Sequence, residues 1–294
     1  MWHIYYVFII ELNFNRRKLI EVLIGMCRLV GFLLNDREAF NMVFKAFIEA
    51  SRHNFIAEKT LEFRSHDDGW GVSMVLVNEN ISILNYKTRK PVWKDMYGKN
   101  FLKKINASKI LVGIIHSRKA SKDMPINGFS SHPYTILLND GSLLYLVQNG
   151  GINREKGYKL LNEKYSFNIN NVTDTFIYML LLKQIYDNID GKDKLIDSVT
   201  ELHKLLLNKN IGGKCINTMI LQITPLNEIY LIVVRAIYKD SLKRYCELYV
   251  DRSKHIFCSS TIAEKLDNFT EMGENKIFQL KVGKNISVKE ISLD

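Results

Sequence analysis

A cysteine directly follows a methionine at Met26-Cys27. A chain translated from Met26 and trimmed by methionine aminopeptidase would begin with Cys27, which would then carry both a thiol and a free α-amine. An α-amine has a pKa of about 7.7–8.0 and a free cysteine thiol one of about 8.5, so near neutral pH the amine can accept the thiol proton during nucleophilic attack. A second interpretation makes Cys27 a small apolar residue of a buried first strand, which suits Leu29, Val30 and Phe32.

Two further groups of polar residues stand where predicted strands end. The triplet His116-Ser117-Arg118 follows an apolar strand predicted over 109–115. Strand ends often present functional groups, although a solvated strand end is equally common. The run Gln148-Asn149-Gly150-Gly151 ends a hairpin built around Asn139-Asp140-Gly141. Its small residues either expose backbone N–H groups beside the Asn149 side chain or form another turn.

A carboxylate lies at the start of the first central helix. Thr173 or Asp174 can act as the N-cap of a helix predicted over 176–189, and a cap is the more common role for such an aspartate. A second helix is predicted over 192–207. Earlier in the chain, His66-Asp67-Asp68-Gly69-Trp70-Gly71 predicts a tight turn that leads into an alternating strand over 72–77.

These elements define a fold class. Strands are predicted at the start of the chain, two helices in the middle, and strands again over 217–223, 229–237, 245–250, 255–259, 276–282 and 286–291. Asp36 can cap a further helix that follows the Cys27 strand. This order favours an α+β protein with antiparallel sheets. The chain of 294 residues shows no repeat or linker that would divide residues 27–294 into two domains.

The net charge of +10 raises the question of a nucleic-acid partner. Lysine and arginine are scattered among acidic residues and no run of five basic residues occurs, so a solvated basic surface is the better interpretation. The four cysteines, Cys27, Cys215, Cys246 and Cys258, show neither CxxC spacing nor the density of a disulfide scaffold. We therefore expect a reducing cytoplasm, no zinc site and no membrane segment.

Residues 1–26 fit the rest of the chain poorly. Their apolar run from Trp2 to Ile10 is too short to cross a bilayer, and the basic cluster Arg16-Arg17-Lys18 comes after that run rather than before it. The segment is an extra strand or helix, a short pro-segment, or upstream sequence wrongly included in the reading frame. We expect it to be an extension of a single domain that begins at Cys27.

Six features in order resemble one family. Cys27, the Asp68–Gly71 loop, His116-x-Arg118, His132-Pro133, Asn149-Gly150 and Thr173-Asp174 are similar to the motifs of the class II glutamine amidotransferases, which belong to the N-terminal-nucleophile hydrolase superfamily. The resemblance is to the stand-alone glutaminase-domain type and extends from Cys27 to near the C-terminus. It implies a four-layer αββα sandwich in which two antiparallel sheets pack face to face.

The resemblance also implies roles for individual residues. Cys27 is the nucleophile, and its own α-amine is the base. Asn149, through its side chain, and Gly150, through its N–H, form the oxyanion hole. Arg118 holds the α-carboxylate of glutamine and Asp174 its α-ammonium, and His116 is assigned with them to substrate binding. No metal or organic cofactor is implied.

Three departures from the family pattern stand out. Gln148 replaces the histidine that usually precedes the oxyanion Asn-Gly, which can alter the support of that loop. Lys119 replaces a residue that is commonly Trp or Gln, which affects substrate specificity. The extension 1–26 would place a peptide nitrogen where the base should be.

The sequence therefore predicts a cytoplasmic amidohydrolase that cleaves the γ-carboxamide of glutamine through a γ-glutamyl thioester on Cys27. Ammonia is lost or passed to a separate synthetase subunit. One alternative is a γ-glutamyl peptide or amide hydrolase that uses the same site. Another is a catalytically silent regulatory subunit, and a nucleic-acid-binding role is a distant third.

Overall fold

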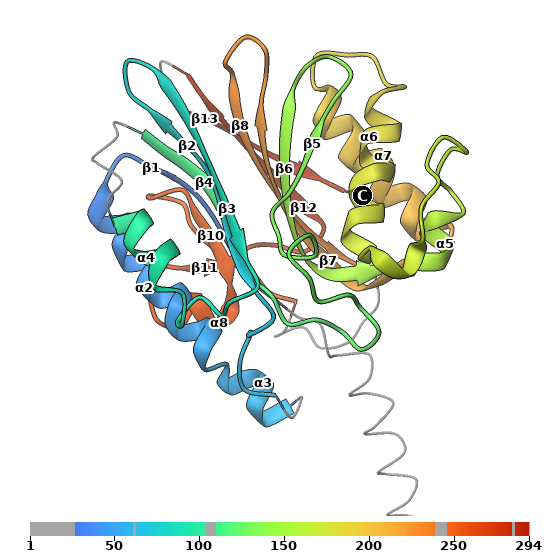
Figure 1. Ribbon diagram of the computed structural model, residues 1–294. Helices are drawn as coiled ribbons and strands as arrows, with labels where there is room; N and C mark the ends of the chain where they lie inside the picture. The colour runs from blue at the N-terminus through green and yellow to red at the C-terminus, as the bar shows by residue number, and fades with distance from the viewer. Residues whose placement is uncertain (1–26, 61–62, 104–109, 239–245, 284–285, 294) are drawn as a thin grey trace, which may run out of the picture.

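The computed structural model describes residues 27–60, 63–103, 110–238, 246–283 and 286–293. Two antiparallel β-sheets lie face to face, and helices cover the outer face of each (Figure 1). The order of layers is helix, sheet, sheet, helix. The predicted α+β class and the four-layer αββα sandwich are confirmed. The extension 1–26 lies outside the described residues.

The first sheet contains the N-terminal strand. Its seven strands have the order β11-β9-β10-β1-β4-β2-β3, with β1 and β4 near the middle. Buried Val, Leu and Ile side chains along β1 and β4 explain their central position, because such strands are covered on both faces. The strands are β1 (Arg28–Leu34), β2 (Trp70–Val77), β3 (Ile81–Thr88), β4 (Ile110–Ser117), β9 (Leu248–Asp251), β10 (Ile256–Ser259) and β11 (Thr270–Glu271).

The second sheet has six strands in the order β13-β12-β8-β7-β6-β5. Its long strands β6 and β7 run from the apolar interior to the edge where polar residues gather. The strands are β5 (Tyr134–Leu137), β6 (Leu143–Ile152), β7 (Gly212–Ile223), β8 (Ile229–Ile237), β12 (Lys276–Val282) and β13 (Ser287–Ser292).

The helices form the two outer layers. Asp36 caps α2 by accepting from the N–H groups of Glu38 and Ala39, as the sequence predicted. On the first sheet lie α2 (Arg37–Arg52), α4 (Met96–Lys103) and α8 (Ser260–Ala263), with α3 (Phe55–Thr60) beyond the sheet's lower end (Figure 1). On the second sheet lie α5 (Arg154–Tyr158), α6 (Asp174–Tyr186) and α7 (Lys194–Asn208), with a 3₁₀ turn at Ile169–Asn171.

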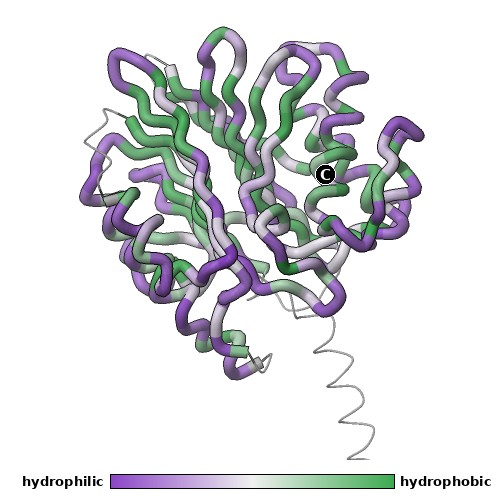
Figure 2. Tube along the Cα trace, viewed as in Figure 1, coloured by the Kyte–Doolittle hydropathy of each residue, from purple (hydrophilic) through white to green (hydrophobic). Residues whose placement is uncertain are grey.

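Three apolar clusters match the layers. One lies between α2 and the first sheet, one between α6, α7 and the second sheet, and one between the two sheets. The strands are correspondingly hydrophobic along most of their length, whereas polar residues gather at connecting loops (Figure 2). Burial of apolar surface between layers is the main stabilising contribution to such a fold.

The cysteine prediction is wrong in one respect. Cys215 and Cys246 form a disulfide, whereas Cys27 and Cys258 are not disulfide-bonded. A single bridge between residues 31 apart has neither a motif nor a density that sequence counting can detect. The fold brings the two together because β7 begins beside the segment that leads into β9. Among the described residues, no helix is long and apolar enough to span a membrane.

Candidate active site

Strand register places Cys27 beside Arg118. Arg28 on β1 pairs with Ser117 on antiparallel β4, so the residues just before and just after this pair are neighbours at the same edge. Leu29 packs in the cluster between the sheets. Side chains alternate along a strand, so Cys27 belongs to that inner face, two positions before Leu29.

Asn149 reaches Cys27 from the opposite sheet. It lies two positions after Val147, which belongs to the same inter-sheet cluster, and therefore continues the inner face of β6. The Cys27 backbone nitrogen donates to Asn149 Oδ1 at 2.8 Å. Asn149 Nδ2 is buried and has no hydrogen-bond partner within the described structure. The Asn149 side chain thus accepts from the Cys27 nitrogen with its oxygen and keeps its N–H donors available.

The Cys27 thiol is a weak acid in this environment. The residue is 5% exposed, and its Sγ lies 3.8 Å from the Lys119 carbonyl oxygen. Burial raises the pKa of the thiol to about 11, although the Lys119 contact and the Arg118 charge partly offset this. A thiol with so high a pKa is almost entirely protonated at neutral pH, so attack requires a base at hand.

Gly150 is fixed by close packing rather than by a turn. The hairpin strand predicted over 142–147 does not end before the run 148–151, because β6 continues to Ile152. Gly150 has φ +88°, and an added Cβ would clash with the Cys215 carbonyl on β7. Only glycine fits this combination of backbone angle and close approach. Its N–H donates to Asn149 Oδ1 at 3.0 Å, so this predicted oxyanion donor already has a partner.

Asp174 is the first residue of α6, and Thr173 is its cap. Thr173 Oγ1 accepts from Phe176 N at 3.2 Å, which leaves the Asp174 carboxylate available for other contacts. Asp174 lines the cavity, and its Oδ2 accepts from Ile152 N at 3.1 Å. Burial raises the pKa of the carboxyl, against the lowering effect of this hydrogen bond and of Arg118.

Arg118 lines the same cavity and also holds a loop. It is 4% exposed, and its Nη1 donates to Pro125 O at 2.9 Å and to Ser130 Oγ at 3.1 Å. The guanidinium therefore organises the segment 121–131 while its charge faces the cavity. Arg118, a cation, and Asp174, a carboxylate, thus line the same cavity as Cys27.

His116 does not line the cavity. It is fully buried behind the wall, and its Nε2 lies 3.2 Å from Gln148 O and 2.9 Å from His132 Nδ1. Since a carbonyl only accepts, the His116 proton is on Nε2, and His132 Nδ1 is an acceptor. Burial lowers the pKa of His116 to about 3, so the ring is neutral. His116 therefore supports β6 through the Gln148 carbonyl from behind the cavity wall.

Sequence reasoning missed two polar groups in the cavity wall. His132 lines the cavity, and the network above leaves its proton on Nε2, which is buried and without a partner among the described residues. Gln148 also lines the cavity, and both polar atoms of its side-chain amide are buried without a partner in the part of the chain that the structure describes. Lys119 is held away from a substrate role by Asp67, whose Oδ1 lies 2.8 Å from its Nζ. The order of motifs identified these positions but not their exposure to the cavity.

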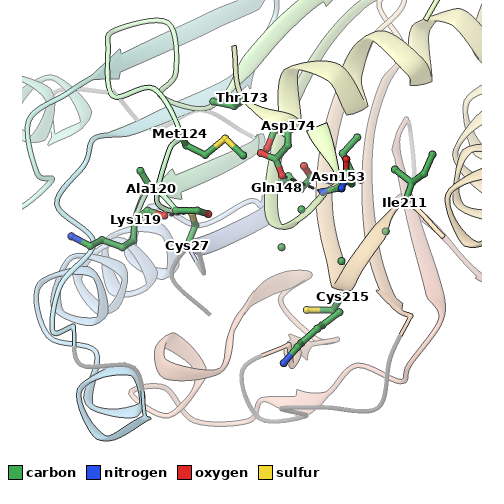
Figure 3. A pocket seen from close by; sticks show the side chains of 18 of the residues that line it. Cys27, Lys119, Ala120, Met124, Gln148, Asn153, Thr173, Asp174, Ile211 and Cys215 are labelled. Atoms are coloured by element: carbon green, nitrogen blue, oxygen red, sulfur yellow. Dashed lines mark hydrogen bonds between the residues drawn. The ribbon is translucent and has the colours of Figure 1, made fainter. Parts of the chain in front are cut away.

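The cavity itself extends well beyond Cys27. Its volume is about 470 Å³, and its farther wall comes from α5 and the start of β7. Cys27 and Lys119 lie on one side of the cavity in Figure 3, with Ile211 and Cys215 on the other. Among the described residues, no group of three or more His, Cys, Asp and Glu side chains is arranged to hold a metal ion. The farther wall was not predicted from the sequence.

Comparisons with known proteins identify the fold. No family model and no curated protein matches the chain. A solved structure described as the allosteric regulatory enzyme of purine biosynthesis matches 91% of the chain at TM-score 0.60 and 14% identity, over 49% of its own length. A glutamine phosphoribosylpyrophosphate amidotransferase from B. subtilis matches 92% at TM-score 0.55 and 12% identity, also over 49%.

The chain thus spans about half the length of these two solved structures. At such low identity the likeness concerns the fold alone. The chain, with its two-sheet α+β architecture, thus shares its fold with the solved amidotransferase from B. subtilis.

Proposed function

We propose that this protein is a class II glutamine amidotransferase-like amidohydrolase that cleaves the γ-carboxamide of glutamine. The observation that carries the proposal is the contact between Cys27 N and Asn149 Oδ1, 2.8 Å apart across the two sheets. It joins the buried candidate oxyanion donor to the candidate nucleophile, which lines the cavity together with the buried cation of Arg118 and the carboxylate of Asp174. The fold shared with a named glutamine amidotransferase supports it.

The reaction begins with proton transfer within one residue. In a chain that starts at Cys27, the α-amine accepts the thiol proton as Sγ attacks the γ-carbonyl carbon. Since the buried thiol has a pKa of about 11, an intramolecular base is needed at neutral pH. Asn149 Oδ1 holds the amine beside the thiol and so keeps this base in place.

The developing oxyanion is stabilised by Asn149 Nδ2, a buried donor that has no partner among the residues that the structure describes. Gly150 N–H joins it when the substrate oxygen replaces Asn149 Oδ1 as its acceptor. The carbon–nitrogen bond then breaks, and ammonia leaves with the proton carried by the α-ammonium. Water next attacks the thioester, giving up a proton to the amine, and the carbon–sulfur bond breaks to release glutamate and the thiol.

Arg118 and Asp174 select the free amino acid end. The guanidinium binds the α-carboxylate and the carboxylate binds the α-ammonium. This role requires Asp174 to be ionised, and its raised pKa restricts binding at acidic pH. His116 acts behind the wall as a positioning residue for Gln148 and His132.

The active form begins at Cys27. A chain that retains residues 1–26 has a peptide nitrogen at the position of the base, and a peptide nitrogen cannot accept the thiol proton. The decisive experiment measures glutamate release by the full chain and by the chain expressed from Met26, after mass spectrometry of each N-terminus. Activity in the short form alone supports the proposal, whereas full activity with residues 1–26 attached would overturn it.

Ammonia released in this site passes to solution or to a synthetase on another polypeptide. An uncleaved extension would favour the alternative of a silent regulatory subunit, and a free Cys27 amine would count against it, so the same N-terminal measurement bears on both. The cytoplasmic location and the absence of a nucleic-acid partner and of a cofactor stay predictions.

A further inference from the structure

The cavity is larger than the glutamyl group requires. Its volume of about 470 Å³ falls in the range of about 300–1,000 Å³ that is typical for drug-sized ligands. Cys27, Arg118 and Asp174 account for the glutamyl end. The remaining wall comes from residues 153–156 at α5 and residues 210–215 at the start of β7. A group attached beyond the scissile bond would face this second wall.

The charges of the lining residues are unequal. The basic residues are Arg118, Lys119, Lys156 and Lys214, and the acidic residue is Asp174. In the proposed function Arg118 binds the α-carboxylate of the substrate. Lys119 is paired with Asp67 at 2.8 Å. Lys156 and Lys214 remain, and within the part of the chain that the structure describes neither makes an ion pair. Two lysines that make no ion pair with any described carboxylate therefore line the cavity.

Both lysines stand on fixed backbone. Lys156 lies in the first turn of α5, where its N–H donates to Asn153 Oδ1 at 2.9 Å. The Lys214 carbonyl accepts from Tyr238 N at 2.9 Å, which ties this part of β7 to the end of β8. Cys215, the next residue, is joined by its disulfide to Cys246. The two ammonium groups therefore extend from anchored positions rather than from a free loop.

We infer that the site accepts γ-glutamyl amides whose leaving amine carries an acidic group, a carboxylate or a phosphate, which Lys156 and Lys214 bind. This inference rests on the proposed function. The chemistry is the same: Sγ attacks the γ-carbonyl carbon, and the carbon–nitrogen bond breaks. The acidic amine leaves with the proton of the Cys27 ammonium. Water then cleaves the thioester to glutamate.

The test uses substrates that differ only in charge. γ-Glutamylglycine and γ-glutamylglycinamide present a carboxylate and a carboxamide at the same position. The γ-glutamyl derivatives of phosphoethanolamine and ethanolamine do the same for a phosphate. The chain expressed from Met26 and the full chain are assayed on all four and on glutamine, in low and in high salt. The readout is the ratio of kcat/KM for the charged to the uncharged partner.

We expect a ratio of about 10 or more for at least one pair at low salt, since a charge-assisted contact corresponds to about tenfold or more in binding. High salt should reduce it, because partly exposed charges are screened. The double variant Lys156→Gln, Lys214→Gln should bring the ratio near 1. The control Lys159→Gln, Lys209→Gln changes two exposed lysines outside the cavity and should keep the ratio. The pair that shows the preference identifies the acid as carboxylate or phosphate.

A ratio near 1 for both pairs, with glutamine cleaved, would overturn this inference and leave the proposed function standing. The inference would also be overturned if the double variant Lys156→Gln, Lys214→Gln kept the preference for the charged substrate, because another group would then recognise the acid. Failure of the processed short form to cleave any of the five substrates would overturn both.

Discussion

The inner faces of the two sheets differ between their two ends. At one end Leu33, Val112 and Tyr145 pack into a buried apolar cluster between the sheets. At the other end, the same faces of the same strands present Cys27 and Asn149 in hydrogen-bond contact. The alternation that hides apolar side chains thus also brings polar ones together where the strands reach the edge. The apolar core and the polar candidate site therefore follow one another along the same strands, through the same alternation of side chains.

The comparison predicts that changes at the polar end mainly affect activity and changes at the apolar end mainly affect stability. The largest effect should come from Cys27→Ala in the short form, which removes the sulfur that forms the thioester. We expect no detectable glutamate release and no labelling by a glutamine-like alkylating analogue. Cys258→Ala is the matched control. Cys258 is likewise buried and not disulfide-bonded, but its side chain lies in the apolar cluster between α2 and the first sheet. Equal loss in both variants would indicate a folding defect and break the comparison.

Asn149→Ala should lower kcat by about 10²–10³, the cost typical of losing one oxyanion donor. Its control is Asn217→Ala on the neighbouring strand. Asn217 pairs directly with Asn149 in the ladder, but its side chain donates to Cys246 O. The control should lose stability and keep kcat within a few-fold. Near-normal kcat in Asn149→Ala would remove this side chain from the mechanism.

Arg118→Ala or Asp174→Ala should lower kcat/KM for glutamine about 10–100-fold, because a charge-assisted contact contributes about 1.5–3 kcal/mol. Cys27 should stay alkylatable in both. Ser130→Ala tests the two roles of Arg118 separately. It removes the 3.1 Å contact with Nη1, together with the bonds of Ser130 Oγ to Asn127, and leaves the charge of the guanidinium in place. A loss as large in Ser130→Ala as in Arg118→Ala would show that loop support, and not substrate charge, is what the guanidinium provides.

The pH dependence should sharpen the assignment of Asp174. Burial raises the pKa of its carboxyl, so on acidification the anion is lost at a higher pH than for an ordinary aspartate. The kcat/KM for glutamine should accordingly fall as pH drops through this raised value, while kcat at saturation changes less. A decline only near an ordinary aspartate pKa of about 3.9 would contradict the assignment.

The smallest effect on activity should come from the apolar end. Leu33→Ala removes a buried side chain from the inter-sheet cluster and should cost about 2–5 kcal/mol of unfolding free energy. The kcat of the folded fraction should stay near that of the parent. Denaturant unfolding and kinetics measured on the same sample test both statements. A large fall in kcat without loss of stability would show that the two ends are coupled.

Much of the fold was predictable because long apolar strands leave a clear pattern. The strands 229–237 and 276–282 were predicted to the residue. β3 was missed since it has one buried position, Leu84, and hence no alternation to detect. α5 has five residues and is too short to show a helical period.

The site was predictable in its residue types but not in its geometry. The order of motifs pointed to Cys27, Arg118, Asn149 and Asp174. Whether His116 faces a substrate depends on how β4 of one sheet packs against β6 of the other. The local sequence does not determine this packing. Lys156 and Lys214 come from segments with no motif, so only the folded chain places them at one cavity.

Asn149 stands within a paired strand, and this has a consequence for how the protein moves. Its partner on β7, Asn217, is itself paired with Arg235 on β8, so Asn149 is tied into a three-strand ladder. The amide hydrogens of this stretch should exchange with solvent only through sub-global opening. The segment 121–131 lies in a connection, held through the Arg118 contacts. Local fluctuation should expose the amides of segment 121–131 first. On one side of the site amide hydrogens should therefore exchange quickly, and on the side formed by β6 they should exchange slowly.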